Sequence, residues 1–165
     1  MNVFPEINTD NCVLTRLSIE DVTNLKEIFD DEQTIRYIPE IYELISLNDG
    51  IARFLSVFDY YLAQDEGILW GIRNNKVLIG FIAIMDLSSD TSLFYAMHPI
   101  YRSCGFMKES IKAVIDFVIR NELCGCIQSE VFKNNVVSIS LLKSLGFKII
   151  GVYKDKFRLK RQLLS

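Results

Sequence analysis

The stretch that decides the fold is FYAMHPIYRSCGFMKES, residues 94–110. It opens on the end of a β-rich run, Pro99 cannot donate to a strand ladder, and apolar residues at helical spacing follow Gly105. A short strand-to-helix loop leaves backbone N–H groups pointing outward at a helix N-terminus, where they and the helix dipole bind phosphate. A single glycine is also typical of an ordinary loop. The stretch therefore predicts a strand, a loop and a helix, and leaves an anion site open.

Upstream of this stretch, the pattern predicts three antiparallel strands. Residues 68–72 and 76–85 are β-rich and flank Asn74-Asn75, two residues that tolerate the positive φ angles of a two-residue hairpin turn. Residues 92–97 form the third strand.

The N-terminal part predicts one strand, at residues 11–17, and two helices. Ser18 and Asp21 have the spacing of a capping box, so a first helix begins there. Asn48 or Asp49 can cap a second helix. Its apolar positions recur at i, i+3, i+4, i+7 and i+11, namely Ile51, Phe54, Leu55, Phe58 and Leu62.

The downstream part predicts two more helices and three strands. They are a helix from Phe106 ending at Asn121, a strand at 127–132, a helix from Asn135 stopped by Gly146, and strands at 147–153 and 157–164. The order β-α-α-β-β-β-α-β-α-β-β predicts an α/β or α+β layer with a mixed sheet and four helices.

The composition is that of a globular protein. The chain has 165 residues, 50% of them hydrophobic and 24% charged, so we expect one domain over residues 1–165 with enough apolar residues for a core. The longest apolar run, residues 77–85, is far shorter than the ~18–20 residues needed to cross a bilayer. The N-terminus has neither the basic patch nor the apolar run of a secretory signal. We expect a cytoplasmic protein that does not bind membranes.

The cysteines and the single histidine do not predict a metal site. Cys12, Cys104, Cys124 and Cys126 have neither zinc-finger spacing nor the pattern of a disulfide framework. His98 beside Pro99 fits a turn at the end of a strand better than a catalytic base. We therefore expect reduced thiols and no metal.

The net charge of −3 conceals an asymmetry. Residues 1–66 carry 14 Asp and Glu against 4 Lys and Arg, whereas residues 67–165 carry 7 against 14. Solvated faces explain such a split, and it also suits a cationic ligand on one side and an anionic ligand on the other.

Two motifs in the right order carry a resemblance to a known family. Residues 94–110 resemble the acetyl-CoA pyrophosphate motif of the GNAT superfamily of N-acyltransferases, Arg/Gln-x-x-Gly-x-Gly/Ala, with matches at Arg102, Gly105 and Glu109. Residues 130–147 resemble the family's strand, Asn-x-x-Ser helix and Leu-Gly-Phe turn. Residues 9–17 and 34–39 look like the branch that contains ribosomal-protein N-terminal acetyltransferases and spermidine acetyltransferases.

This resemblance implies a fold and an activity. The fold is a mixed, mostly antiparallel, V-split sheet flanked by about four helices. The activity is transfer of an acetyl group from acetyl-CoA to a primary amine within a ternary complex, without a metal. The residues that it implies for cofactor binding are Met97, Arg102, Ser103, Cys104, Gly105, Phe106, Met107, Lys108, Asn135 and Ser138.

The sequence departs from the family's pattern at three positions. Met107 stands where the family prefers Gly or Ala, and Ser103 replaces the common first glycine. Leu142 stands where many members carry a tyrosine that protonates the departing thiolate. We expect Met107 to turn its side chain away and still offer its N–H. Met107 and Leu142 favour the alternative, an inactive acyl-CoA-binding sensor or interaction module of the same fold.

Three side chains are candidates for catalysis. Glu130 matches the base carboxylate of some members, and its structural alternative is a solvent-facing strand residue. Ser138 matches the serine that some members of this branch use, and its alternative is a helix cap. Tyr153 could reach the cleft from the other side, and its alternative is an edge-strand aromatic.

The sequence does not name the acceptor. Protein N-termini, polyamines and small-molecule amines are all acetylated by relatives, and a cationic acceptor would suit the acidic part of the chain. The alternating charges of residues 154–161 are typical of a half-exposed terminal strand rather than a nucleic-acid site. Monomer and homodimer both stay open.

Overall fold

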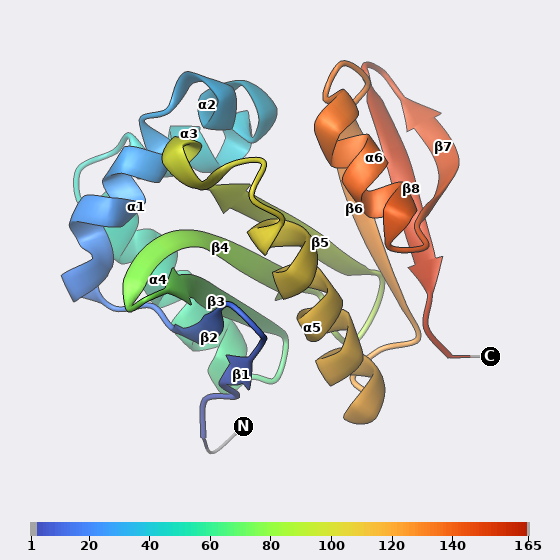
Figure 1. The fold of residues 1–165 in the computed structure, drawn as a ribbon, viewed down its shortest axis with the longest axis horizontal. Helices are drawn as coiled ribbons and strands as arrows, with labels where there is room; N and C mark the ends of the chain where they lie inside the picture. Colours follow the sequence, from blue (N-terminus) through green and yellow to red (C-terminus); the bar gives the residue numbers. More distant parts are fainter. Residues whose placement is uncertain (1–2, 165) are drawn as a thin grey trace.

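A mixed sheet of eight strands organises the computed structural model, which describes residues 3–164 (Figure 1). The predicted lack of a secretory signal concerns in part Met1 and Asn2, which lie outside the described residues, as does Ser165. The strands are β1 (Ile7–Asn8), β2 (Val13–Arg16), β3 (Gly67–Asn74), β4 (Val77–Met85), β5 (Thr91–Met97), β6 (Cys126–Phe132), β7 (Lys148–Tyr153) and β8 (Lys156–Gln162). Their order across the sheet is β1-β2-β3-β4-β5-β6-β8-β7.

The sheet is split between β5 and β6. These two strands are parallel and pair at only two positions, Thr91 with Ile127 and Ser92 with Gln128, after which they diverge (Figure 1). The other neighbouring strands are antiparallel. The predicted fold, a mixed and mostly antiparallel sheet with a V-shaped split, is confirmed.

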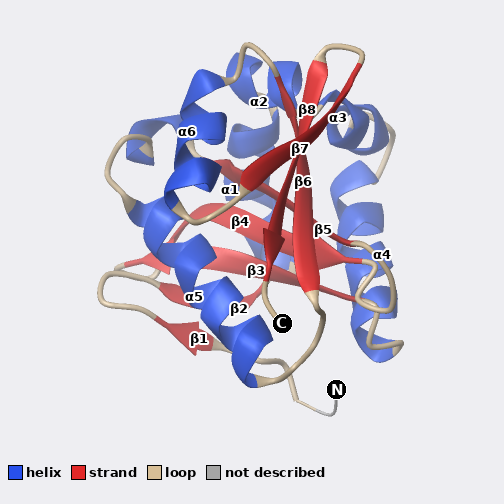
Figure 2. Ribbon diagram, turned by 90° about the vertical axis from the view of Figure 1, so that its right-hand side faces the viewer, coloured by secondary structure: helices blue, strands red, loops and turns tan. Residues whose placement is uncertain are grey.

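Helices cover both faces of the sheet. They are α1 (Val22–Phe29), α2 (Glu32–Tyr37), α3 (Pro39–Ile45), α4 (Gly50–Ala63), α5 (Phe106–Arg120) and α6 (Val136–Ser144). Figure 2 shows α4 and α5 on opposite sides of the strands. One core lies under α1 and α4 and includes Phe29, Phe54 and Phe81; the other lies under α5 and α6 and includes Trp70 and Leu142.

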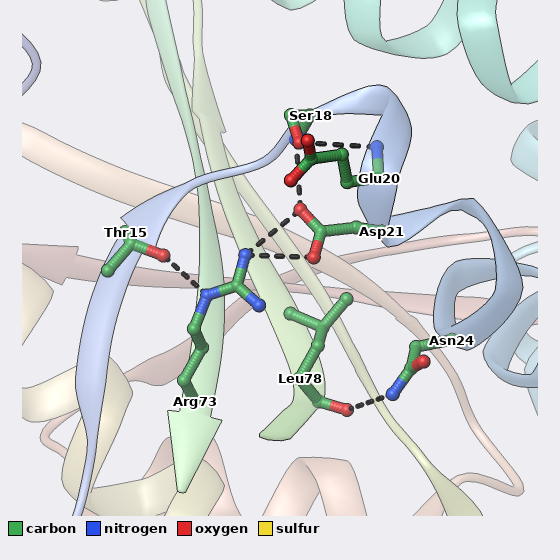
Figure 3. A network of polar contacts seen from close by, with 7 residues as sticks. All are labelled: Thr15, Ser18, Glu20, Asp21, Asn24, Arg73 and Leu78. Atoms are coloured by element: carbon green, nitrogen blue, oxygen red, sulfur yellow. Dashed lines mark hydrogen bonds and ion pairs between the residues drawn. The ribbon is translucent and has the colours of Figure 1, made fainter. Parts of the chain in front are cut away.

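The predicted capping box at Ser18 is present and is part of a larger polar network (Figure 3). Asp21 accepts the Ser18 N–H at 2.9 Å, and Arg73 Nη2 contacts both carboxylate oxygens of Asp21 at 2.9 Å. Arg73 Nε also donates to Thr15 Oγ1 at 2.8 Å. The cap opens a short 3₁₀ turn rather than α1 itself, and the network fastens that turn to β2 and β3.

The hairpin turn between β3 and β4 lies one residue beyond its predicted place. Asn75 and Lys76 have the positive φ angles, 48° and 68°, whereas Asn74 still belongs to β3. The register of this hairpin also shifts between Ile72 and Arg73, which marks a bulge or irregularity close to the turn. A bulge of this kind leaves no clear signature in hydrophobic alternation.

Two helices and one strand were not predicted. Helices α2 and α3 have six and seven residues, too few for a helical period to show, and β1 has two. The described chain therefore has six α-helices instead of four. At α4, Asp49 occupies the predicted N-cap position, but its backbone is left-handed and its side chain makes no capping bond. None of the described helices is both long and apolar enough to cross a membrane.

Candidate active site

A cavity of about 520 Å³ lies where β5 and β6 diverge. Five segments line it: residues 94–97 of β5, residues 129–131 of β6, the loop and helix start around residues 101–108, the first turns of α6, and part of α2. The split in the sheet therefore brings together segments that are far apart in the sequence.

The loop before α5 has the geometry of an anion site. Gly105 is the N-cap of α5 with a φ of 82°, and Ser103 has a φ of 62°. The first helical hydrogen bond runs from the Glu109 N–H to the Gly105 carbonyl at 3.1 Å. The N–H groups of Phe106, Met107 and Lys108 consequently have no acceptor within the helix, and all three residues line the cavity.

Arg102 lines the cavity, but its guanidinium is held by the start of α2. Its Nη2 contacts Asp31 Oδ2 at 2.6 Å and Thr34 Oγ1 at 3.3 Å, and its Nη1 donates to Gln33 at 3.2 Å. Burial raises the pKa of Asp31, but the hydrogen bonds from Arg102 and Thr34 outweigh it, so the pKa lies below its ordinary value. The free protein thus uses Arg102 to tie the loop to α2.

The remaining residues of this motif have different surroundings. Met97 and Met107 both line the cavity, Met97 is buried in the core under α5, and the Met107 side chain packs against that core. Cys104 is exposed and is not among the lining residues; its Sγ donates to the Arg102 carbonyl at 3.5 Å. Glu109 turns to the β1–β2 connection, where it accepts hydrogen bonds from Thr9 and Asn11.

Helix α6 also points its N-terminus at the cavity. Asn135 Oδ1 accepts the Ser138 N–H at 3.3 Å and caps the helix. The Ser138 hydroxyl forms a hydrogen bond with the Tyr95 hydroxyl of β5, across the split. Leu142 is fully buried in the core and does not line the cavity.

Glu130 lines the cavity from β6 and is paired with Arg158, its direct neighbour on β8. Arg158 Nη2 and Nε contact Glu130 Oε1 at 2.7 and 3.2 Å. Both contacts fall on the same oxygen. Among the contacts of the described residues, Oε2 is left to accept another proton.

Two side chains considered from the sequence lie elsewhere. Tyr153 is 59% exposed on β7, at the outer edge of the sheet, and the structure does not bring it to the cavity. His98 Nδ1 accepts the Ile100 N–H at 3.3 Å, and its Nε2 contacts Glu27 at 2.8 Å. His98 therefore caps the turn after β5, in line with the structural interpretation.

Sequence reasoning missed Tyr95 and the contribution of α2. Tyr95 stands two residues before Met97, so strand alternation places both on the same face of β5. That signal was present in the sequence. Residues Gln33, Thr34, Tyr37 and Ile38 of the α2 region also line the cavity. The resemblance of residues 34–39 to one branch of the family drew attention to this segment, but it did not assign the segment to the site.

Comparisons with known proteins agree with this geometry. Residues 11–148 match the acetyltransferase (GNAT) domain family. The uncharacterized N-acetyltransferase YoaA of Bacillus subtilis (strain 168) is 27% identical over 158 residues, which cover 93% of this chain and 88% of the relative.

Two solved structures share the fold at low sequence identity. One is an acetyl transferase from Salmonella typhimurium that modifies the N-terminal serine of a ribosomal subunit protein, with a TM-score of 0.80, 11% identity, and coverage of 96% of this chain and 99% of that chain. The other is the spermidine N-acetyltransferase from Vibrio cholerae in complex with CoA and spermine, with a TM-score of 0.78, 15% identity, and coverage of 93% and 96%. With the family match over most of its length, the chain belongs to the GNAT acetyltransferase family and is an acetyl-CoA-dependent acetyltransferase, as its sequence predicted.

Proposed function

We propose that this protein transfers the acetyl group of acetyl-CoA to a primary amine directly, within a ternary complex. The observation that carries the proposal is that two helix N-termini, those of α5 and α6, open into one cavity between two diverging strands. The first suits a pyrophosphate and the second suits a developing negative charge on sulfur.

The cavity supports a specific course for CoA. The N–H groups of residues 106–108 bind the pyrophosphate, and Lys108 adds a positive charge beside them. Beyond Ser92 and Gln128, β5 and β6 no longer pair with each other. The Leu93 carbonyl accepts a hydrogen bond from the Ser129 hydroxyl at 3.0 Å, and the facing backbone groups further along the strands can bond the amides of the pantetheine arm. This course leads the thioester toward Ser138.

The acetyl transfer needs a base and a group that stabilises the leaving thiolate. Glu130 Oε2 takes one proton from the ammonium, and the free amine then attacks the thioester carbonyl. When the C–S bond breaks, its electron pair stays on sulfur, and the Ser138 hydroxyl donates a hydrogen bond to the sulfur. The second proton of the amine is then transferred to the thiolate, which becomes the thiol of CoA. The products are the amide, CoA and one released proton.

The acceptor enters beside α2. Tyr37 and Ile38 line that side of the cavity, and the exposed carboxylates of Glu32 and Glu43 lie on α2 and α3, beside Glu40, whose carboxylate is paired with Lys156 at 2.9 Å. This acidic surface favours the approach of a cationic amine. The relatives described above act on a protein N-terminus and on a polyamine, and both classes stay candidates for this chain, together with small-molecule amines.

The experiment that tests the proposal is a thiol-release assay with acetyl-CoA over a panel of peptides with free N-termini, polyamines and small monoamines. We expect CoA release that depends on one class of amine, with the acetylated product identified by mass spectrometry. Tight binding of acetyl-CoA without amine-dependent release over the whole panel would favour the inactive sensor instead.

A further inference from the structure

The Tyr95 hydroxyl lies in the cavity and bonds to Ser138, although no motif in the sequence singles it out. We propose that Tyr95 is a positioning residue for acetyl transfer: its hydroxyl donates to Ser138 Oγ, and this directs the Ser138 proton at the sulfur of the departing CoA. The inference rests on the proposed function, because it requires the thioester to lie at the N-terminus of α6.

The direction of this hydrogen bond follows from acidity. A phenol is a much stronger acid than an aliphatic alcohol, so in a pair of hydroxyls the phenol is the better donor and the alcohol oxygen the better acceptor. When Tyr95 is the donor, the hydroxyl hydrogen of Ser138 takes no part in the hydrogen bond between the two side chains. It is free to point at a ligand in the cavity.

Ser138 is held from two directions. Its backbone N–H donates to Asn135 Oδ1 at 3.3 Å, and its side chain is held by Tyr95 from the opposite wall of the split. A serine hydroxyl rotates freely when nothing fixes it. The two contacts remove that freedom before the substrate binds, which lowers the entropic cost of donating to the sulfur.

Burial keeps Tyr95 in the protonated form. It raises the pKa of Tyr95 to about 12, against a smaller lowering effect of the hydrogen bond with Ser138. Tyr95 therefore remains a donor at neutral pH. Leu142, at the position where a helix tyrosine would stand, is fully buried and has no hydroxyl to offer.

The reaction consumes no proton from Tyr95. As the C–S bond breaks, sulfur takes the electron pair and accepts the Ser138 hydrogen bond, while the Tyr95 hydrogen bond stabilises the added charge on the Ser138 oxygen. The proton of the thiol comes from the acceptor amine. Tyr95 ends the cycle as it began.

The test measures the thiol pKa of bound CoA from the ultraviolet absorbance of its thiolate, which needs no knowledge of the acceptor. We expect the wild-type protein to lower this pKa relative to free CoA. Tyr95→Phe should raise it by about one unit, a tenfold change in thiolate population. Ser138→Ala should raise it at least as much, and the double variant no further than Ser138→Ala, because the two hydroxyls act as a unit.

Tyr61→Phe is the matched control. Tyr61 packs its ring on Phe58 in α4, with centroids 5.7 Å apart, and does not line the cavity. It should leave the thiol pKa unchanged. With a reactive amine in hand, Tyr95→Phe should lower kcat about tenfold with little change in the KM for acetyl-CoA.

The outcomes separate this inference from the proposed function. If wild-type protein does not bind CoA, the proposed function fails and the inference falls with it. If CoA binds and Tyr95→Phe changes only the melting temperature, with thiol pKa and kcat as in wild type, Tyr95 merely fastens β5 to α6 and the inference is wrong. A thiol pKa that Ser138→Ala raises and Tyr95→Phe does not would also overturn it.

Discussion

At the scale of single residues, the site consists of side chains that are fixed by partners before any substrate arrives. Glu130 is held through Oε1 by Arg158, and Ser138 is held by Asn135 and Tyr95. In each case one atom is left for chemistry, Oε2 of Glu130 or the hydrogen of Ser138. Groups that are fixed in advance stabilise the transition state more than flexible groups do, because they need no reorientation at the moment of reaction.

The role of Glu130 leads to the first prediction. Glu130→Gln removes the proton acceptor and should lower kcat about 10²–10⁴-fold at neutral pH, the range for a positioned base, with little change in acetyl-CoA affinity. The deficit should shrink as the pH rises, because the amine then loses its proton to solvent and no longer needs the base. The pH dependence of kcat in wild type and variant checks this.

Asp59→Asn is the control for that variant. Asp59 forms an exposed ion pair with Arg16 at 2.8 Å, comparable with the pair of Glu130 and Arg158, but on β2 and α4. It should leave kcat unchanged. Wild-type rates for Glu130→Gln at every pH would assign catalysis to proximity alone.

Met107 leads to the second prediction. Met107 lines the cavity, and its N–H is one of the groups that we assign to the pyrophosphate. Met107→Ala removes the bulk of the side chain at the position where the family prefers a small residue, so acetyl-CoA affinity should be preserved or improved, as titration calorimetry would show. A clear loss of affinity would mean that the thioether itself packs on the cofactor.

At the scale of elements, the anion site depends on how α5 begins. Gly105 has a φ of 82°, a Cβ added there would meet no protein atom within 4 Å, and the residue lines the cavity. A methyl group would therefore project into the space left for the ligand. Gly146 after α6 has a similar φ of 87° but lies beside Arg161 instead.

This pair of glycines gives the third prediction. Gly105→Ala and Gly146→Ala should both destabilise the fold by about 1–2 kcal/mol, because each places a Cβ in the left-handed region. Only Gly105→Ala should weaken acetyl-CoA binding, by at least tenfold. Equal affinities in the two variants would place the pyrophosphate elsewhere.

The elements also show what the sequence could and could not predict. The long helices α4 and α5 and the strands β3 to β5 were predictable, because they span several periods of a regular apolar pattern. Helices α2 and α3 were not, since their stability comes from packing and from contacts such as that of Asp31 with Arg102, 71 positions apart in the chain. The turn at Asn75-Lys76 was misplaced by one residue, because Asn74 and Asn75 are equally good turn residues and only the pairing of Asn74 with Val77 decides between the two placements.

The same distinction applies to the site. Motif residues in the loop, in α6 and on β6 were predictable one by one, and ten of those that we named line the cavity: Met97, Arg102, Ser103, Gly105, Phe106, Met107, Lys108, Glu130, Asn135 and Ser138. The residues with which these side chains form hydrogen bonds were not predictable. The hydrogen bonds of Ser138 with Tyr95 and of Arg102 with Asp31 join residues that only the fold brings together, and the outward position of Tyr153 depends on β7 being an edge strand.

At the scale of the whole molecule, the two sides of the split differ in charge. Residues 1–66, rich in carboxylates, contribute β1, β2 and α1 to α4 to one side, which also carries basic residues such as Arg102 and Lys108, whereas the lysines and arginines after residue 142 lie around α6, β7 and β8 on the other side. The cavity lies where β5 and β6 diverge, between these two sides. A cationic acceptor and an anionic cofactor can therefore approach one site from differently charged surfaces.

The central claim is that this cavity binds acetyl-CoA, and the most direct measurement is the melting temperature with and without it. At 100 times the dissociation constant, a ligand specific for the native state stabilises it by ~2.7 kcal/mol. For a chain of this size, this corresponds to an increase of roughly 5–11 °C. We predict an increase in this range that falls to about half or less in Gly105→Ala, because its affinity is at least tenfold lower, and that is kept in Gly146→Ala. An unchanged melting temperature at millimolar acetyl-CoA, with unfolding still cooperative, would contradict the account.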